Sequence, residues 1–364
     1  MPNTDCMSSE ADQDISIVLI SRNRAPFLER AFSHLSRLGF GGTILLADAS
    51  REEGKADVAA VVEEFSGRLK LSLTSYPEDA PLFFRLRRQF EIVTSKYAVW
   101  MGDDDLLFPD ALREAVARLD MCPGAVGAVG RSVQFEVEGS RSFGIVAGMG
   151  TYPQRGYEAA TGAQRVYDNV ADLVALSYSL RRTSFMQSLL RQIDELNVRD
   201  DIFGYFVSEL MDGMLTVASG KVLYVDRLMM MRQAHAGSMA ATGGLFSGWD
   251  AFVSGSDWPR IQTDCNTSLT HALMASDAAT KDACAIVAKG AIATCVERTE
   301  RRAADVNGRR GQKAAATTPS MALRKLIPAM ARRRLSRWRT SAGLDKADQQ
   351  QFRRTIHFIE RSGQ

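Results

Sequence analysis

The first 120 residues alternate short apolar runs with helical stripes, and this pattern restricts the possible folds more than any other feature of the chain. Four runs have the length of β-strands: 15–20, 43–47, 69–73 and 97–101. Both faces of the first run are apolar, as in a strand buried inside a parallel sheet. Strands that alternate with helices favour parallel pairing. We therefore predict an α/β fold with a doubly wound, mostly parallel sheet flanked by helices and followed by a helical C-terminal region.

The fourth run ends at Gly102 and is followed by three acids in succession, Asp103, Asp104 and Asp105. Open α/β sheets bind ligands at the carboxyl ends of their strands. Adjacent carboxylates repel one another unless a cation or a hydrogen-bond network holds them together. Mg²⁺ or Mn²⁺, bound by one or two carboxylates and by diphosphate oxygens, would suit such a cluster. The alternative is an acidic turn that caps the helix predicted to begin at Pro109.

Composition narrows the class of protein. The chain has 364 residues, of which 45% are hydrophobic and 24% charged, and this is typical of a soluble globular protein. Its five cysteines lack CxxC spacing, so neither a zinc site nor a disulfide framework is indicated. Neither a signal-peptide pattern nor an apolar stretch of about 20 residues is present, so we expect a cytoplasmic protein.

Polar residues follow the first two strands as well. The first is followed by Ser21-Arg22-Asn23-Arg24, with Pro26 in the first turn of the next helix, and the second by Asp48-Ala49-Ser50. With the acidic segment 96–112, these stretches resemble family 2 glycosyltransferases in three ordered motifs over roughly the first 130 residues. The resemblance implies a GT-A fold, a nucleotide-sugar donor and a divalent metal held by a DxD motif.

The resemblance also implies roles for individual residues. Asp48 would contact the base of the donor nucleotide. Two positions depart from the family pattern, because many members have a further Asp where this chain has Ala47 and another where it has Gly102. A helix at 81–94 carries Arg85, Arg87 and Arg88 where the family often has a basic residue that faces the donor. The implied donor-binding residues are Ser21, Arg22, Asn23, Asp48, Arg87, Asp103 and Asp104. The implied metal ligands are Asp103, Asp105 and His235.

A general base is expected on the helix predicted at 201–219, which ends at Gly220. In many family members an acidic pair precedes such a glycine by about a dozen residues, which makes Glu209 the candidate. Asp201 and Asp212 are the alternatives. The base would take a proton from an acceptor hydroxyl as its oxygen attacks the anomeric carbon. Glu209 could equally be an exposed helix charge.

The expected domain organisation has five parts. A disordered N-terminus at 1–14 precedes a glycosyltransferase domain at 15–240, with a nucleotide-sugar-binding half at 15–130 and an acceptor-side half at 131–240. A helical extension at 241–302, a linker at 303–320 and a basic amphipathic segment at 321–364 complete the chain. From Arg301 to Arg339 twelve basic residues accompany a single acid, Asp305. This segment could rest on an anionic membrane or pack on the acidic body of the chain.

The sequence therefore favours a metal-dependent inverting glycosyltransferase for cell-surface glycan or glycolipid assembly. Its expected partners are a nucleotide-sugar donor, a hydroxyl acceptor on a glycan, a lipid-linked sugar or a protein, and the inner face of the membrane, but no nucleic acid. A nucleotidyltransferase or pyrophosphorylase acting on sugar phosphates is a second hypothesis, although the first turn lacks the Gly-rich loop usual there. A non-catalytic nucleotide-sugar-binding protein is a third. A dehydrogenase is disfavoured because no GxGxxG follows the first strand.

Overall fold

The protein is described here by a computed structural model. It describes residues 12–361 except 173, 197–200, 236–248, 316–335, 338 and 342, and it describes only the backbone of 201–208, 250, 302–303 and 305–315. Most of the predicted N-terminal segment, residues 1–11, lies outside this part of the chain. So does most of the basic stretch at 321–339.

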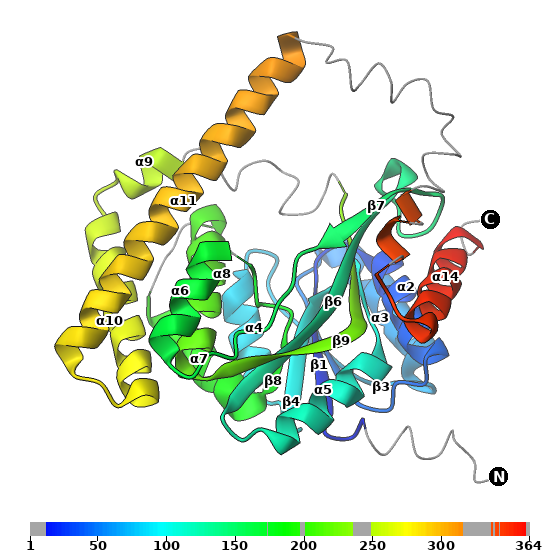
Figure 1. Ribbon diagram of the computed structural model, residues 1–364. Helices are drawn as coiled ribbons and strands as arrows, with labels where there is room; N and C mark the ends of the chain where they lie inside the picture. The colour runs from blue at the N-terminus through cyan, green and yellow to red at the C-terminus, as the bar shows by residue number, and fades with distance from the viewer. Residues whose placement is uncertain are drawn as a thin grey trace.

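A nine-stranded sheet forms the centre of the molecule, in the order β3-β2-β1-β4-β8-β6-β9-β5, with β7 paired to β6 (Figure 1). The strands are β1 (Ile15–Ser21), β2 (Thr43–Asp48), β3 (Lys70–Ser75), β4 (Tyr97–Gly102), β5 (Asp105–Leu107), β6 (Ala125–Val137), β7 (Val146–Tyr152), β8 (Leu180–Arg182) and β9 (Lys221–Gln233). The first four pair in parallel, as the sequence predicts. The β6–β9 pair is also parallel, whereas β5, β7 and β8 join in antiparallel fashion.

Helices connect the strands and cover the sheet. The helices are α2 (Ala25–Arg37), α3 (Glu52–Ser66), α4 (Leu82–Glu91), α5 (Pro109–Met121), the short 3-10 helix η1 (Glu138–Ser140), α6 (Gly162–Asp172), α7 (Thr183–Glu195), α8 (Asp201–Ser219), α9 (Trp249–Val253), α10 (Trp258–Asp277), α11 (Lys281–Ala315) and α14 (Lys346–Arg361). The α2 helix buries Leu28, Phe32 and Leu35 against the sheet, as its apolar spacing predicts. The predicted α/β architecture, a mostly parallel sheet flanked by helices with a helical C-terminal region, is confirmed.

The C-terminal helices separate into two groups (Figure 1). Helices α10 and α11 pack with α6 and α8 at one end of the molecule. Helix α11 continues to Ala315 through Gly308 and Gly311, so much of the linker expected at 303–320 is helical. Two glycines disfavour a helix by only about 1 kcal/mol each and do not end this one. Helix α14 lies at the other end, beside α2 and β7.

Helix α14 is part of the fold rather than a separate tail. Its apolar residues Phe352, Ile356 and Ile359 are buried in a second core with residues of β5, β6 and β9. The carboxylate of Asp348 accepts hydrogen bonds from the Leu228 backbone N at 2.6 Å and from Arg227 Nε at 3.1 Å. The expected 321–364 segment is therefore divided, since its last helix covers the sheet with its apolar face and that face is not available to a membrane.

The N-terminal boundary also differs from the expected one. Asp12 is fully buried, and its carboxylate accepts hydrogen bonds from the Gly41 backbone N at 2.9 Å and from Arg113. The structure therefore includes residues 12–14, which were expected to be disordered, and Arg113 supplies the counter-charge for the buried Asp12. Among the helices in the described part of the chain, none combines the length and the apolar content that crossing a bilayer requires.

Candidate functional site

The strand ends bring the predicted polar residues to one edge of the sheet. In the parallel register, Ser21 at the end of β1 lies opposite Asp48 at the end of β2, and Ile20 lies opposite Gly102 at the end of β4. The acids at 103–105 therefore lie beside the turn that follows β1. This is the position at which open α/β sheets bind ligands.

The acidic cluster, defined here as Asp103, Asp104 and Asp105, is held by hydrogen bonds from the first turn. The Ser21 hydroxyl donates to Asp103 Oδ2 at 2.7 Å. One nitrogen of Arg24, Nη1, lies 3.1 Å from Asp103 Oδ1 and 3.1 Å from Asp104 Oδ2. His235, which follows β9, donates from Nε2 to Asp104 Oδ2 at 2.8 Å. Ser21, Arg24 and His235 therefore all contact the acids that the sequence indicated as a metal site.

Two further arginines add positive charge to the acidic cluster. Arg232 lies opposite Asp105 in the β5–β9 pair, with its Nε 3.8 Å from Asp105 Oδ2. Its guanidinium lies over the rings of Tyr152 and Tyr178, 4.6 and 4.3 Å from their centroids, and donates to the Tyr178 hydroxyl at 2.9 Å. Arg30 is fully buried and donates to the backbone oxygen of Asp104 at 2.6 Å.

Burial and neighbouring charges give the three acids different pKa values. Desolvation and the charge of Asp104 raise the pKa of Asp103 to about 6 and that of Asp105 to about 7. Desolvation acts in the same direction on Asp104, but the hydrogen bond from His235 and the charge of Arg24 outweigh it and lower the pKa of that carboxyl. Asp104, whose side chain is 14% exposed, is therefore the acid of the cluster most strongly held in its ionised form.

The turns after β1 and β2 are joined by a hydrogen-bond chain. Asp48 is buried and accepts from the backbone N and the hydroxyl of Ser50 at 3.2 and 2.7 Å. The Ser50 hydroxyl in turn accepts from the Asn23 backbone N at 2.8 Å, and Asn23 Oδ1 accepts from the Arg51 backbone N at 2.8 Å. Asn23 has a φ of 57°, a conformation that asparagine tolerates better than most residues. The first turn is therefore fixed relative to Asp48.

The arginines near these turns differ from the sequence-based assignment. Arg87 does not face the acidic cluster, because its guanidinium pairs with Glu91 at 2.9 Å and with Asp194 at 3.1 Å. Arg85 is buried instead and donates to the backbone oxygens of Ser21 and Ala47 at 2.9 and 3.2 Å. Arg22 lies outside the cluster and pairs with Glu78 at 3.2 Å.

The candidate bases on α8 have different surroundings. Glu209 is half-buried, and desolvation raises the pKa of its carboxyl to about 7, against the charge of Arg232. Arg232 and Tyr152 both interact electrostatically with Glu209 and Asp105. Asp212 is buried and forms a bidentate ion pair with Arg181 at 2.6 and 2.7 Å, so its oxygens are engaged. The side chain of Asp201 and all of Asp200 lie outside the described residues.

Gly102 leaves space beside two carboxylate oxygens. A Cβ atom at this position would lie 2.6 Å from Asp104 Oδ1 and 3.6 Å from Asp105 Oδ2, so a larger residue would collide with Asp104. Asp105 Oδ2 is buried and accepts no hydrogen bond among the described residues. These oxygen donors suit a hard cation such as Mg²⁺ or Mn²⁺. Asp104 and Asp105 would then hold the ion, since both oxygens of Asp103 already accept hydrogen bonds.

In the described part of the chain no group of three or more His, Cys, Asp or Glu side chains is arranged to hold a metal ion. Two carboxylates are enough when diphosphate oxygens and water complete the coordination. Asp104 and Asp105 alone would therefore suit only a cation whose remaining ligands come from a bound molecule and from water. His235 would act through Asp104, which it orients, rather than as a ligand itself.

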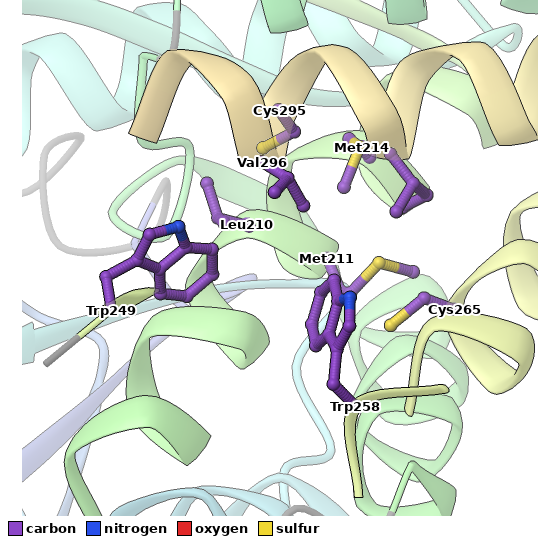
Figure 2. A pocket seen from close by; sticks show the side chains of 9 residues that line it. Leu210, Met211, Met214, Trp249, Trp258, Cys265, Cys295 and Val296 are labelled. Carbon is purple, nitrogen blue, oxygen red and sulfur yellow. The ribbon is translucent and has the colours of Figure 1, made fainter. Parts of the chain in front are cut away.

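An apolar pocket lies between α8, α9, α10 and α11 (Figure 2). It has an empty volume of about 290 Å³ and is lined by Leu210, Met211, Met214, Trp249, Trp258, Cys265, Ile292, Cys295 and Val296. None of these side chains is a carboxylate or a cation. The lining of this pocket therefore offers no carboxylate for acid–base chemistry.

Arg232 and Tyr178 carry no assignment from the sequence. Arg232 lies near the end of β9, three residues before His235, so its position in the polar end of the strand could have indicated a role in the site. Tyr178 lies 54 residues from Arg232 along the chain, and no sequence pattern indicated its contact with Arg232. Arg24 was visible in the first turn, yet its contact with two acids depends on the pairing of β1 with β4.

Comparisons with known proteins find only distant similarity. No protein family model matches the chain, and no curated protein matches it. The solved structures that it is similar to include S. aureus TarS 1-349 in complex with UDP-GlcNAc, with 13% identity, a TM-score of 0.44 and coverage of 82% of this chain and 92% of that one. Another is the mannosyltransferase PcManGT from Pyrobaculum calidifontis in complex with GDP-Man and Mn²⁺, with 13% identity, a TM-score of 0.40 and coverage of 94% and 86%. The chain spans 44% of a longer S. aureus TarS structure, at 12% identity and a TM-score of 0.41.

Proposed function

We propose that this protein is a glycosyltransferase that moves a sugar from a nucleotide-diphosphate-sugar donor to a hydroxyl acceptor, with inversion at the anomeric carbon. One observation carries the proposal. The acidic cluster and a carboxyl group with a raised pKa, Glu209, share the same arginine, Arg232, at the carboxyl edge of the sheet. Such a pairing of a charge-binding site with a poised acid or base is typical of enzymes.

The nucleoside would bind over the turns after β1 and β2. Asp48 offers a buried carboxylate there, and Ser50 and Asn23 fix the backbone around it. A carboxylate can accept a hydrogen bond from an N–H of a nucleotide base. Ser21 and Arg24 would then lie beside the diphosphate, next to the acidic cluster.

Glu209 would be the general base. A carboxyl with a pKa of about 7 is close to the value at which a base both accepts a proton readily and is ionised at neutral pH. It would take the proton from the acceptor hydroxyl while the oxygen attacks the anomeric carbon from the face opposite the diphosphate. Arg232 would keep Glu209 close to the ionised form and add positive charge near the departing diphosphate.

A divalent cation, when bound by Asp104 and Asp105, would neutralise charge on the diphosphate as it leaves. The residues of this chain do the remaining work. Ser21 and Arg24 hold Asp103, His235 orients Asp104, and Tyr152 and Tyr178 fix the plane of the Arg232 guanidinium.

The acceptor would be a hydroxyl on a glycan, a lipid-linked sugar or a protein. We place the protein in the cytoplasm, at or near the inner face of the membrane, and we place any membrane contact in the basic stretch before α14 rather than in α14. Vesicle co-sedimentation with a deletion of residues 321–335 tests this, since α14 would remain. Binding to anionic vesicles that is unchanged by the deletion would argue against the basic stretch.

A thermal-shift screen of nucleoside diphosphates with and without Mn²⁺ tests the function. A ligand that binds the native state raises the apparent Tm by mass action, so one nucleoside diphosphate should raise it more than the others and more with Mn²⁺. Transfer and hydrolysis assays with the matching nucleotide sugars then follow. A preference for a nucleoside triphosphate with a sugar 1-phosphate would favour a nucleotidyltransferase, and binding without turnover would favour a non-catalytic protein.

A further inference from the structure

Arg24 already neutralises part of the acidic cluster, because it contacts Asp104, one of the two acids that would hold a cation, together with the neighbouring Asp103. Its Nη1 lies 3.1 Å from an oxygen of Asp103 and 3.1 Å from an oxygen of Asp104, which brings one positive group between two carboxylates. The side chains of those acids are 3% and 14% exposed, so water screens the interaction weakly. Arg24 is therefore an internal counter-ion of the cluster.

The cluster is balanced by side chains of the same protein. Three carboxylates face three arginines, because Arg232 lies 3.8 Å from Asp105 and Arg30 binds the backbone oxygen of Asp104. A cation that enters this cluster meets repulsion from the arginines already there. The three acids alone therefore do not attract a divalent ion as strongly as their number suggests.

Arg24 is the arginine best able to leave. Arg30 is fully buried and also donates to the backbone oxygen of Ser142 at 2.7 Å. Arg232 is held between two tyrosine rings and belongs to β9. Arg24 is 26% exposed and stands in the turn before α2, on a backbone that Asn23 anchors. Its guanidinium also lies 5.8 Å from the centroid of the Phe27 ring. Because Arg24 precedes α2 and belongs to no strand, a rotation of its side chain would leave the strand pairing unchanged.

We propose that Arg24 is a displaceable counter-ion, so that a divalent cation enters the acidic cluster only when the guanidinium moves from Asp103 and Asp104 to a nucleoside diphosphate. The diphosphate arm of this proposal rests on the proposed function. A diphosphate can accept two parallel hydrogen bonds from the planar guanidinium. In the structure a single nitrogen of Arg24 is instead shared between two carboxylates, which is a poorer geometric match. Metal and nucleotide then bind together, and each raises the affinity of the other by the same factor.

The first test uses Mn²⁺ alone, without any nucleotide, and measures free Mn²⁺ by electron paramagnetic resonance during titration of the full-length protein. Arg24→Gln should bind Mn²⁺ roughly 10- to 100-fold more tightly than the unchanged protein, the range that corresponds to a charge-assisted hydrogen bond. Arg22→Gln is the matched control, since Arg22 lies two residues away in the same turn but pairs with Glu78 outside the cluster. Its Mn²⁺ affinity should not change.

Equal Mn²⁺ affinities for Arg24→Gln and the unchanged protein would overturn the proposal. Circular dichroism melts establish that each variant is folded. If Arg24→Gln does not fold, Arg24→Lys takes its place, because an ammonium group keeps the charge but lacks the planar fork. Its Mn²⁺ affinity should rise by a smaller factor, and an affinity no higher than that of the unchanged protein would overturn the proposal equally.

The second test adds a nucleoside diphosphate, with the nucleoside that lacks phosphate as its control. The diphosphate should raise the Mn²⁺ affinity of the unchanged protein at least about tenfold and that of Arg24→Gln by a clearly smaller factor. An equal gain in both would overturn the transfer of Arg24 to the diphosphate. If no nucleoside diphosphate binds at all, the proposed function fails, while the first test still decides whether Arg24 is a displaceable counter-ion.

Discussion

The replacement Asp212→Ala tests whether this acid is structural or catalytic. Its carboxylate and the guanidinium of Arg181 form two hydrogen bonds of 2.6 and 2.7 Å, and their side chains are 2% and 0% exposed. Removal of Asp212 leaves a buried guanidinium without its counter-charge. The remaining acceptors, the Ser179 hydroxyl and the Leu176 backbone oxygen, carry no full charge. Loss of one partner of a buried pair costs about 3–5 kcal/mol.

That cost converts into a measurable change of melting temperature. An unfolding entropy of about 2.1 cal/mol/K per residue, applied to the length of this chain, gives about 0.76 kcal/mol/K in total. The Tm of Asp212→Ala should therefore be roughly 4–7 °C lower than that of the unchanged protein, by differential scanning calorimetry. Glu297→Ala is the control, because Glu297 forms an exposed pair with Arg301 on α11 and its loss should shift Tm by less than about 1 °C.

A double replacement separates the ion pair from the space that it fills. Arg181→Met with Asp212→Leu removes both charges and keeps apolar volume, so it should recover much of the stability lost by the single change. A Tm of Asp212→Ala within about 1 °C of the unchanged protein would refute the structural role. Loss of transfer by a fully stable Asp212→Asn protein would return this acid to the candidate bases.

Three further predictions concern the site and the C-terminal helix. Glu209→Gln should keep nucleotide affinity and lower the transfer rate about 10²-fold or more, and a mutant rate equal to that of the unchanged protein would exclude Glu209 as the base. In the unchanged protein the transfer rate should fall as the pH drops below about 7, because the pKa of Glu209 is about 7 and the base must be ionised. Asp105→Ala should abolish the increase in nucleotide affinity that Mn²⁺ gives in isothermal titration calorimetry, whereas unchanged affinity with EDTA present, in both proteins, would argue against a metal site. Phe352→Ala should cost about 3–5 kcal/mol of stability, since Phe352 is buried in the second core, and a Tm equal to that of the exposed control Arg353→Ala would mean that α14 is not part of the fold.

The sequence determined the strands and their ends. Apolar runs that alternate with helical stripes identify β1 to β4. The runs of β1, β2 and β4 are apolar because these strands are buried on both faces, whereas the edge strand β3 is partly exposed and alternates apolar with polar residues. Since the carboxyl ends of parallel strands meet at one edge, the order of residues along the chain is enough to group Ser21, Asp48 and the acids at 103–105. Their individual roles remain predictions.

Only the tertiary structure decided which charges neutralise the acids. Arg24 and Arg232 lie 79 and 127 residues from Asp103 and Asp105, and nothing in their spacing relates them to the acids. The sequence suggested Mg²⁺ or Mn²⁺ as the counter-charge of the acidic cluster, whereas strand pairing brings arginines from β9 and from the turn before α2 against it. The same holds for Arg87, whose charge could face a ligand but pairs with acids of α4 and α7. It also holds for α14, whose apolar face could contact a membrane but packs on the sheet. Sequence periodicity shows which face of an element is apolar or charged, but the partner of that face depends on contacts between residues far apart in the chain.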